Sequence, residues 1–176
     1  NGLKNYQPEA PTLAEMTDAA IKFLSAKKGN FFLVVEEEGT DNFGNANNAN
    51  GYFEALKRAD DAIGVALDFH SKNPNTLIIT AADSEAGGME IYGFLEKYMM
   101  PDQPLPERAN NGAPLDGING TGTIPFLTAK DKNGNQFQFA VAWSTNDDVY
   151  GSVVARAEGL NSELMKGKID NTEIYR

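Results

Sequence analysis

Two apolar stretches decide the fold: Phe31-Phe32-Leu33-Val34-Val35 and Thr76-Leu77-Ile78-Ile79-Thr80. Each has the length of a strand and is apolar almost throughout, which is typical of strands buried on both faces of a helix-covered sheet. Between them, apolar residues at helical spacing predict a long helix from about Asn50 to His70. Strand, helix and strand in this order predict two parallel strands joined by a right-handed crossover. The predicted fold class is therefore α/β.

A capped helix is predicted before the first of these stretches. Thr12 is followed three residues later by Glu15, which is the spacing of a capping box that satisfies free backbone N–H groups. Apolar residues at helical spacing follow, and Gly29 marks the end of this helix. Farther along, the segment from Asn42 to Asn50 contains five asparagines and is predicted to be a polar loop.

A hairpin is predicted in the C-terminal half of the chain. Asn133-Gly134 is a two-residue turn signal between strand candidates at 124–129 and 136–143. Ahead of it, residues 101–123 are rich in Pro, Gly and Asn, which indicates an irregular excursion. No internal repeat or boundary divides the sequence, so residues 1–176 are predicted to form part of one domain.

The composition is acidic, with 25 Asp and Glu against 15 Lys and Arg and a formal net charge of -10. Nucleic acid is therefore not an expected partner, because binding its phosphates requires a surplus of Lys and Arg. No membrane contact is expected, since no apolar run approaches the roughly 20 residues that span a bilayer. With no cysteine and His70 as its one histidine, the chain cannot assemble a His-rich zinc site.

Acidic residues directly follow both apolar stretches. One group runs from Glu36 to Asp41 and the other from Asp83 to Glu85, and a further polar segment runs from Ser144 to Asp148. Ligands of open α/β sheets gather at the carboxyl ends of the strands, so these groups are expected to converge on one pocket. Its oxygen atoms would suit hard divalent cations. The alternative interpretation is solvated strand ends with incidental acids.

Several ordered motifs resemble those of the alkaline phosphatase family. The matching stretches are Val35-Glu36-Glu37, Asp41, Asn45, Asn47-Asn48, Ala59-Asp60-Asp61-Ala62-Ile63 and Thr76 to Ser84, with Pro11 to Thr17 and Ile169 to Tyr175 toward the two ends. The resemblance covers most of the chain and is weak between about 95 and 135. It implies a three-layer α/β/α fold with a largely parallel central sheet, of which residues 1–176 would be the C-terminal portion.

The resemblance also implies a set of metal ligands. Three residues match carboxylate ligands of the family, one on magnesium and one on each of two zinc ions: Glu36, Asp41 and Asp83. Three others stand where the family has histidines: Asn45, Ser84 and Ser144. Additional candidate ligands are Glu37, Glu85 and Asp148. Because oxygen-bearing side chains replace all three histidines, the expected cofactor is a divalent metal, with Mg²⁺ or Ca²⁺ favoured over Zn²⁺.

The resemblance implies a metal-dependent hydrolase of small phosphoesters, to which this chain contributes metal-site carboxylates. The family's nucleophile, its neighbouring aspartate and its phosphate-binding arginine belong to the N-terminal half, so no catalytic residue is expected here and the chain alone is expected to be inactive. The expected partner is that N-terminal half or a second copy of the chain. A periplasmic or extracellular location is implied. The alternative is a non-catalytic protein of the same fold that binds a structural cation.

Overall fold

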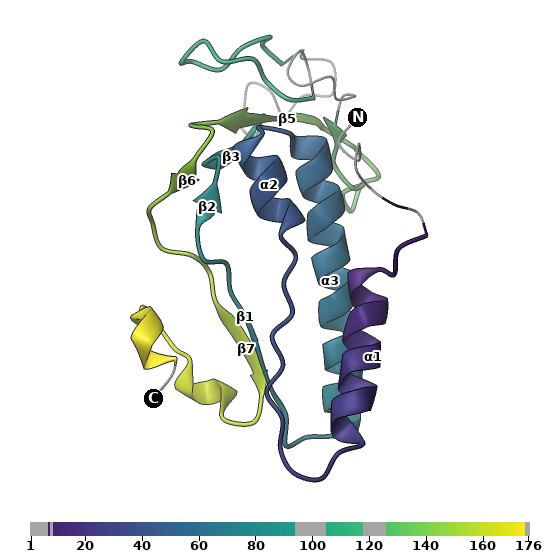
Figure 1. Ribbon diagram of the computed structural model, residues 1–176. Helices are drawn as coiled ribbons and strands as arrows, with labels where there is room; N and C mark the ends of the chain where they lie inside the picture. The colour runs from purple at the N-terminus through teal and green to yellow at the C-terminus, as the bar shows by residue number, and fades with distance from the viewer. Residues whose placement is uncertain (1–6, 8, 94–104, 118–125, 175–176) are drawn as a thin grey trace. The chain divides into compact units, whose positions relative to one another are not determined.

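The computed structural model describes residues 7, 9–93, 105–117 and 126–174 (Figure 1). The chain divides into two compact units, and each is described by itself. We call the first the core unit, which contains Glu38–Leu56 and Ser84–Gly151. We call the second the helix–hairpin unit, which contains Glu9–Glu37, Lys57–Asp83 and Ser152–Arg176.

The strands of the core unit pair antiparallel. Three of them form a sheet in the order β3-β5-β4: β3 (Met89–Tyr92), β5 (Gln138–Trp143) and β4 (Phe126–Leu127). Two shorter strands form a separate pair, β2 (Glu85–Ala86) and β6 (Asp148–Val149). The pair places Ala86 opposite Asp148, so the last residue of the polar segment 144–148 has a fixed position beside β2.

Two helices meet at a tight corner in the core unit. α2 spans Gly39–Asn45 and α3 spans Ala49–Lys72, of which the residues up to Leu56 belong to this unit. Asn47 lies in the left-handed region with φ of 50°, and two backbone bonds close the end of α2: Asn48 N to Phe43 O and Asn47 N to Gly44 O. These bonds form a Schellman motif, with asparagine in the position usually taken by glycine. The predicted polar loop is therefore wrong over 42–45, which is helical.

Aromatic side chains fill the core unit. Val141 is fully buried on β5, and Trp143 is 7% exposed. Phe53 of α3 meets Phe126 edge to face with ring centroids 5.4 Å apart, and Phe126 stacks on Phe139 at 5.3 Å. Such pairs add to the stabilisation that burial of apolar area already gives. The first turns of α3 are thus fixed against the β3-β5-β4 sheet.

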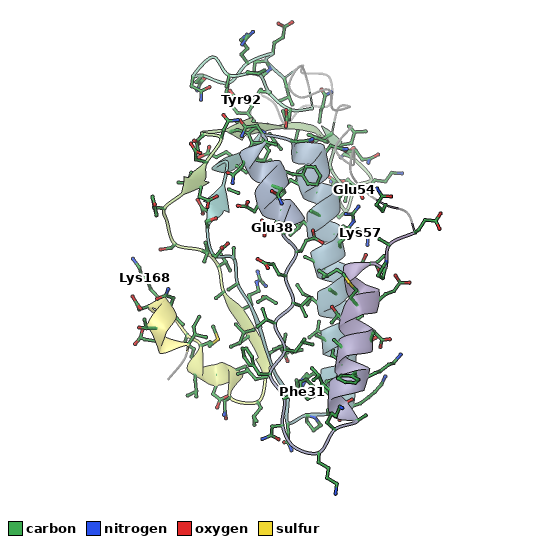
Figure 2. The ribbon with its side chains drawn as sticks, viewed as in Figure 1. Phe31, Glu38, Glu54, Lys57, Tyr92 and Lys168 are labelled. Carbon is green, nitrogen blue, oxygen red and sulfur yellow. The ribbon has the colours of Figure 1, made fainter. Side chains whose placement is uncertain are left out.

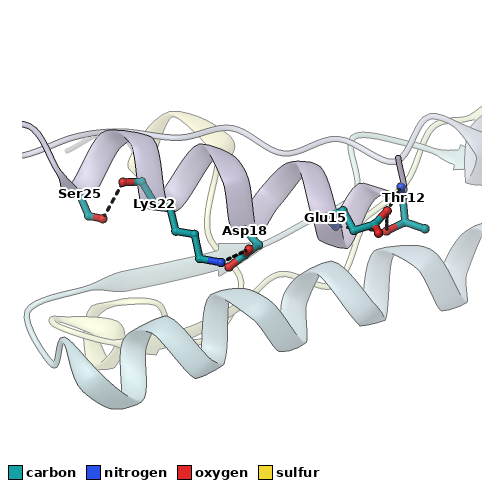
Figure 3. Close-up of polar contacts among 5 residues, drawn as sticks. All are labelled: Thr12, Glu15, Asp18, Lys22 and Ser25. Carbon is teal, nitrogen blue, oxygen red and sulfur yellow. Dashed lines mark hydrogen bonds and ion pairs between the residues drawn. The ribbon is translucent and has the colours of Figure 1, made fainter. Parts of the chain in front are cut away.

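In the helix–hairpin unit, α1 (Leu13–Ser25) confirms the predicted capped helix. Glu15 N donates to Thr12 Oγ1 at 3.2 Å, and Thr12 N donates to Glu15 Oε2 at 2.7 Å (Figure 3). The second predicted helix is confirmed as α3, which extends two residues beyond His70. In Figures 1 and 3, α1 runs alongside the later turns of α3.

The strands of the helix–hairpin unit form one antiparallel pair. β1 (Leu77–Thr80) pairs with β7 (Arg156–Gly159), with Leu77 opposite Gly159 and Thr80 opposite Arg156. Short 3₁₀ turns follow at η2 (Ser162–Leu164) and η3 (Asn171–Glu173). The prediction of a strand at 77–80 is confirmed, but its burial on both faces is wrong, because Leu77 and Ile79 are more than a third exposed.

The predicted parallel pairing of 31–35 with 77–80 is also wrong in this structure. Residues 31–37 form neither helix nor strand, and Phe32 is 90% and Val34 73% exposed. Phe31 contacts Phe69 of α3, with ring centroids 6.1 Å apart (Figure 2). A central parallel strand is stabilised only when it has neighbours in the ladder and layers over both faces. Among the described residues, 31–35 has no ladder partner, so most of its apolar side chains are exposed.

The predicted hairpin is confirmed in outline, as Phe126 lies opposite Phe139 across β4 and β5. Its turn is wider than the predicted two-residue turn at Asn133-Gly134. The side chain of Asp131 accepts bonds from Asn133 N and Asn135 N, both at 2.8 Å, so the turn extends over residues 131–135. Of the predicted excursion, residues 105–117 are irregular apart from isolated bridges, and 101–104 and 118–123 lie outside the described residues.

Candidate functional site

Three polar side chains of the core unit converge between α2 and β6. Asp41 and Asn45 lie one turn apart on α2, and the Asn45 Nδ2 amide donates to Asp41 Oδ1 at 3.2 Å. The same nitrogen donates to Asp148 Oδ1 of β6 at 2.9 Å. One amide thus bridges two carboxylates that are 107 residues apart in sequence, and the bridge relieves their mutual repulsion. We call Asp41, Asn45 and Asp148 the bridge cluster.

The carbonyl oxygen of the Asn45 side chain is buried and accepts no hydrogen bond within the described part of the chain. A buried carbonyl oxygen without a donor is costly, so it marks a place where a further group is needed. Amide oxygen and nitrogen are nearly equivalent in shape, and rotation by half a turn exchanges them. After that rotation, three oxygens would face one another at the distances now spanned by hydrogen bonds.

Those distances suit a hard cation. Neighbouring oxygens around Mg²⁺ at about 2.1 Å, or around Ca²⁺ at about 2.4 Å, lie roughly 3 Å apart. The present separations from Nδ2 of Asn45 to the two carboxylate oxygens are 3.2 and 2.9 Å. The bridge cluster therefore fits an oxygen-ligated cation, and it offers no nitrogen or sulfur ligand of the kind zinc favours.

Close backbone packing fixes α2 beside the β2 turn. A Cβ atom on Gly44 would lie 2.7 Å from the carbonyl oxygen of Ala86, closer than side-chain atoms pack. Asn47 Nδ2 donates to Thr145 O at 2.7 Å and so ties the end of α2 to the segment that leads into β6. These contacts position Asn45 and Asp148 independently of their own side chains. Sequence reasoning missed Asn47 as a structural anchor, although an asparagine after a helix is the signal for it.

The other predicted ligands of the core unit lie around the same turn. Ser144 Oγ donates to Gly88 O at 3.2 Å, so its hydroxyl is engaged with the backbone. Ser84 is half-buried directly before β2, and Glu85 is exposed on β2. Burial raises the pKa of Tyr52 above its ordinary value, and the negative charge of Glu85 adds to the rise.

The remaining predicted ligands belong to the helix–hairpin unit: Glu36, Glu37 and Asp83. Glu36 and Asp83 are exposed, and Glu37 is half-buried. Their membership of one site with the bridge cluster stays a prediction. Within the described ranges, no three acidic or histidine side chains are grouped closely enough to hold a metal ion by themselves. A cation here would need neutral oxygens such as that of Asn45.

A buried carboxylate that the sequence did not single out bonds the start of α3 and the end of β5. Asp116 is 2% exposed, and its Oδ2 accepts from Ala49 N at 2.9 Å and from Trp143 Nε1 at 3.0 Å. The backbone of Asp116 also pairs with that of Val141 on β5, and both N···O distances are 3.0 Å. Its position in an irregular, Pro- and Gly-rich stretch gave no periodic signal of burial.

The fold is of the α/β class, and a cluster of polar side chains lies beside a short helix. The family profile of alkaline phosphatases, described as "Alkaline phosphatase", matches residues 2–176. The chain therefore belongs to the alkaline phosphatase family, which confirms the resemblance drawn from its motifs.

Individual relatives extend over nearly the whole chain. Alkaline phosphatase 4 of Bacillus subtilis is 35% identical over 194 residues, which covers 94% of this chain and 42% of the relative. Alkaline phosphatase 3 of the same organism is 28% identical over 200 residues, covering 96% of this chain and 43% of the relative. This chain thus spans less than half the length of these two relatives.

Solved alkaline phosphatases share the fold. The structure from the Antarctic bacterium TAB5 matches with a TM-score of 0.58 and 27% identity, covering 86% of this chain and 35% of that one. A cold-active alkaline phosphatase from Shewanella sp. matches with a TM-score of 0.65 and 20% identity, covering 96% and 49%. A TAB5 mutant with histidine replaced by aspartate has Mg bound in its M3 site. The predicted α/β fold of alkaline phosphatase type is confirmed.

Within the described residues, no helix combines the length and the apolar character that a membrane span requires.

Proposed function

We propose that residues 1–176 are the C-terminal portion of an alkaline phosphatase-type domain that hydrolyses small phosphoesters and that they supply ligands for a divalent cation. The observation that carries the proposal is the bridge cluster, in which the side-chain amide of Asn45 joins Asp41 and Asp148 at 3.2 and 2.9 Å. Asn45 and Asp41 stand at family ligand positions, and we propose Asp148, which accepts from Asn45 Nδ2, as the third ligand in preference to Ser144, whose hydroxyl donates to Gly88 O.

The proposed cation is Mg²⁺ or Ca²⁺. Carboxylate and amide oxygens are the ligands both ions take, and Ca²⁺ tolerates the mixed, flexible set that this cluster offers. When bound, the cation would polarise a phosphoryl oxygen and stabilise the charge that develops on it. Asp41 and Asp148 would hold it, with Ser84 and Glu85 of the same unit as proposed additional ligands. Glu36, Glu37 and Asp83 are proposed as metal ligands from the family resemblance alone. Asn45 would present its oxygen once the amide has turned.

Catalysis requires a nucleophile, which we place in a further stretch of the alkaline phosphatase domain, on this polypeptide or on another. The exposed apolar run at 31–35 supports this, because Phe32 and Val34 would be covered by neighbouring strands in a complete sheet. The stretch that carries the nucleophile is the proposed partner of this chain, in preference to a second copy of the chain. A periplasmic or extracellular location is proposed from the family alone.

Calorimetric titration of the chain with Ca²⁺, Mg²⁺ and Zn²⁺ tests the cation site. Each of Asp41→Ala and Asp148→Ala is expected to weaken Ca²⁺ binding at least about tenfold, because each removes one charged ligand from a small set. Asp147→Ala is the matched control, since this aspartate is exposed and directly precedes Asp148. Zn²⁺ binding that is tight and depends on Asp41 would refute an oxygen site.

The second candidate is a non-catalytic protein that keeps the cation for structure. It is favoured if Ca²⁺ raises the melting temperature of a complete domain without supporting hydrolysis of p-nitrophenyl phosphate. The hydrolase is favoured if hydrolysis requires both the added stretch and the cation, and is lost in Asp41→Ala. The present chain alone is expected to be inactive in either case.

A further inference from the structure

Asp116 is a carboxylate in an apolar core, and burial of a charge needs compensation. It is 2% exposed and, among the described residues, is one of the largest fully buried side chains, together with Leu115 and Val141. Its Oδ2 accepts two N–H groups, from the Ala49 backbone and from the Trp143 indole. An ionised acceptor makes shorter and stronger hydrogen bonds than a neutral one, which offsets part of the desolvation cost.

The Ala49 N–H is a donor at the first residue of α3. The first N–H groups of a helix have no partner inside the helix, and its N-terminus attracts negative charge. Asp116 therefore acts as an N-terminal cap supplied by a residue 67 positions away. The cap fixes the start of α3, and the Asn47 corner links that start to α2, where Asn45 lies four residues before Ala49.

The second donor connects Asp116 to the other arm of the cluster. Trp143 is the last residue of β5, and the chain reaches Asp148 five residues later. The backbone bridge between Asp116 and Val141 fixes the carboxylate to the same strand. One buried carboxylate thus holds both the helix corner that carries Asn45 and the strand that leads to Asp148.

We propose that Asp116 is a positioning residue for the bridge cluster: its buried carboxylate sets the separation of Asn45 and Asp148 by joining the N-terminus of α3 to the end of β5. This inference depends on the proposed function in one respect only, the expected effect of Asp116 on cation binding. The positioning itself is a property of the chain without any metal. Asp116 is not one of the proposed ligands, because its Oδ2 already accepts from Ala49 N and Trp143 Nε1.

The test uses nuclear magnetic resonance of the whole chain without metal. Trp143 is the only tryptophan, so its indole N–H gives a single, unambiguous signal. In Asp116→Asn, which keeps the size but removes the charge, the indole signal and the side-chain NH₂ signals of Asn45 are both expected to shift. Asp131→Ala, which removes an exposed turn carboxylate of the same unit, should leave both unchanged. A shifted indole with unmoved Asn45 signals would overturn the proposal.

A Ca²⁺ titration of the same variants adds the functional readout. Asp116→Asn is expected to weaken Ca²⁺ binding about tenfold, as is typical for a residue that orients ligands from behind. Unchanged affinity in a folded Asp116→Asn variant would overturn the proposal. If no variant and not even the original chain binds Ca²⁺, the cation site fails, while the metal-free Asn45 signals still decide the positioning role.

Loss of folding in Asp116→Asn would move the test to Trp143→Phe. This variant keeps the carboxylate and the helix cap and removes only the indole donor. A smaller shift of the Asn45 signals in the same direction is expected, and its absence would contradict the proposal.

Discussion

The two units differ in what covers their apolar side chains. In the core unit, Val141 and Trp143 are buried between the antiparallel sheet and α3. In the helix–hairpin unit, Phe32 is 90% exposed, Val34 73% and Phe23 63%. The described strands pair antiparallel in both units, so the difference lies in what covers the apolar residues: α3 packs on the β3-β5-β4 sheet, whereas residues 31–35 have no ladder partner among the described residues. An apolar run is buried only where such neighbours are present.

The largest effect expected concerns aromatic residues in the two units. Trp143→Ala should lower the free energy of unfolding by about 3–5 kcal/mol, because it removes a large core side chain and leaves a cavity. Phe32→Ala should change it by less than about 0.5 kcal/mol, since the ring is already in solvent. Urea unfolding followed by circular dichroism measures both. Equal losses would erase the distinction between the units.

A matched valine pair sharpens the same distinction. Val141 is fully buried and Val34 is 73% exposed, so the same truncation probes opposite surroundings. Val141→Ala is expected to cost about 2 kcal/mol through lost burial and a small cavity. Val34→Ala should cost almost nothing. A large loss for Val34→Ala would mean that residues 31–35 are packed in solution.

The sequence predicted the local features of both units well, because they depend on neighbouring residues. The Thr12–Glu15 box and the length of α3 followed from spacing alone. The exposure of residues 31–35 could not be predicted, because an apolar run carries no information about whether partner strands are present. Asp41 and Asn45 were predicted from the family motifs, although the helix that pairs them was not, and Asp148 and Asp116 reach their positions through tertiary pairing that no local pattern encodes.

A smaller effect is expected at the capping box of the helix–hairpin unit. Thr12→Ala should destabilise α1 by about 1 kcal/mol, because Glu15 N then loses its side-chain acceptor. The bond with the Thr12 backbone holds the pKa of Glu15 below its ordinary value, helped by the Thr12 hydroxyl. The stabilisation that the ionised Glu15 carboxylate gives is therefore present above the unfolded pKa of Glu15 and is lost as pH falls through its folded pKa. Amide exchange of α1 measures both effects, and Ser25→Ala serves as the control.

The smallest effect concerns Tyr52 in the core unit. Burial, reinforced by Glu85, raises the pKa of this phenol, so it should ionise last as pH rises. A raised pKa means that the contribution to stability is complete below the unfolded pKa and is lost as pH rises through the folded one. Ultraviolet titration at alkaline pH should show a late-ionising tyrosine that disappears in Tyr52→Phe. In Glu85→Gln it should ionise earlier, and an unchanged titration would contradict the placement of Glu85.

The central claim is that the core unit carries a cation site built from oxygens alone, and exchanging one ligand tests it most directly. Asn45→His places imidazole beside Asp41 and Asp148, and calorimetry compares Zn²⁺ with Ca²⁺ in both forms of the chain. The account predicts that the histidine form binds Zn²⁺ about tenfold more tightly and Ca²⁺ more weakly than the original chain, because imidazole suits zinc and the amide oxygen suits calcium. Unchanged affinities for both ions would contradict it, since Asn45 would then not be a ligand.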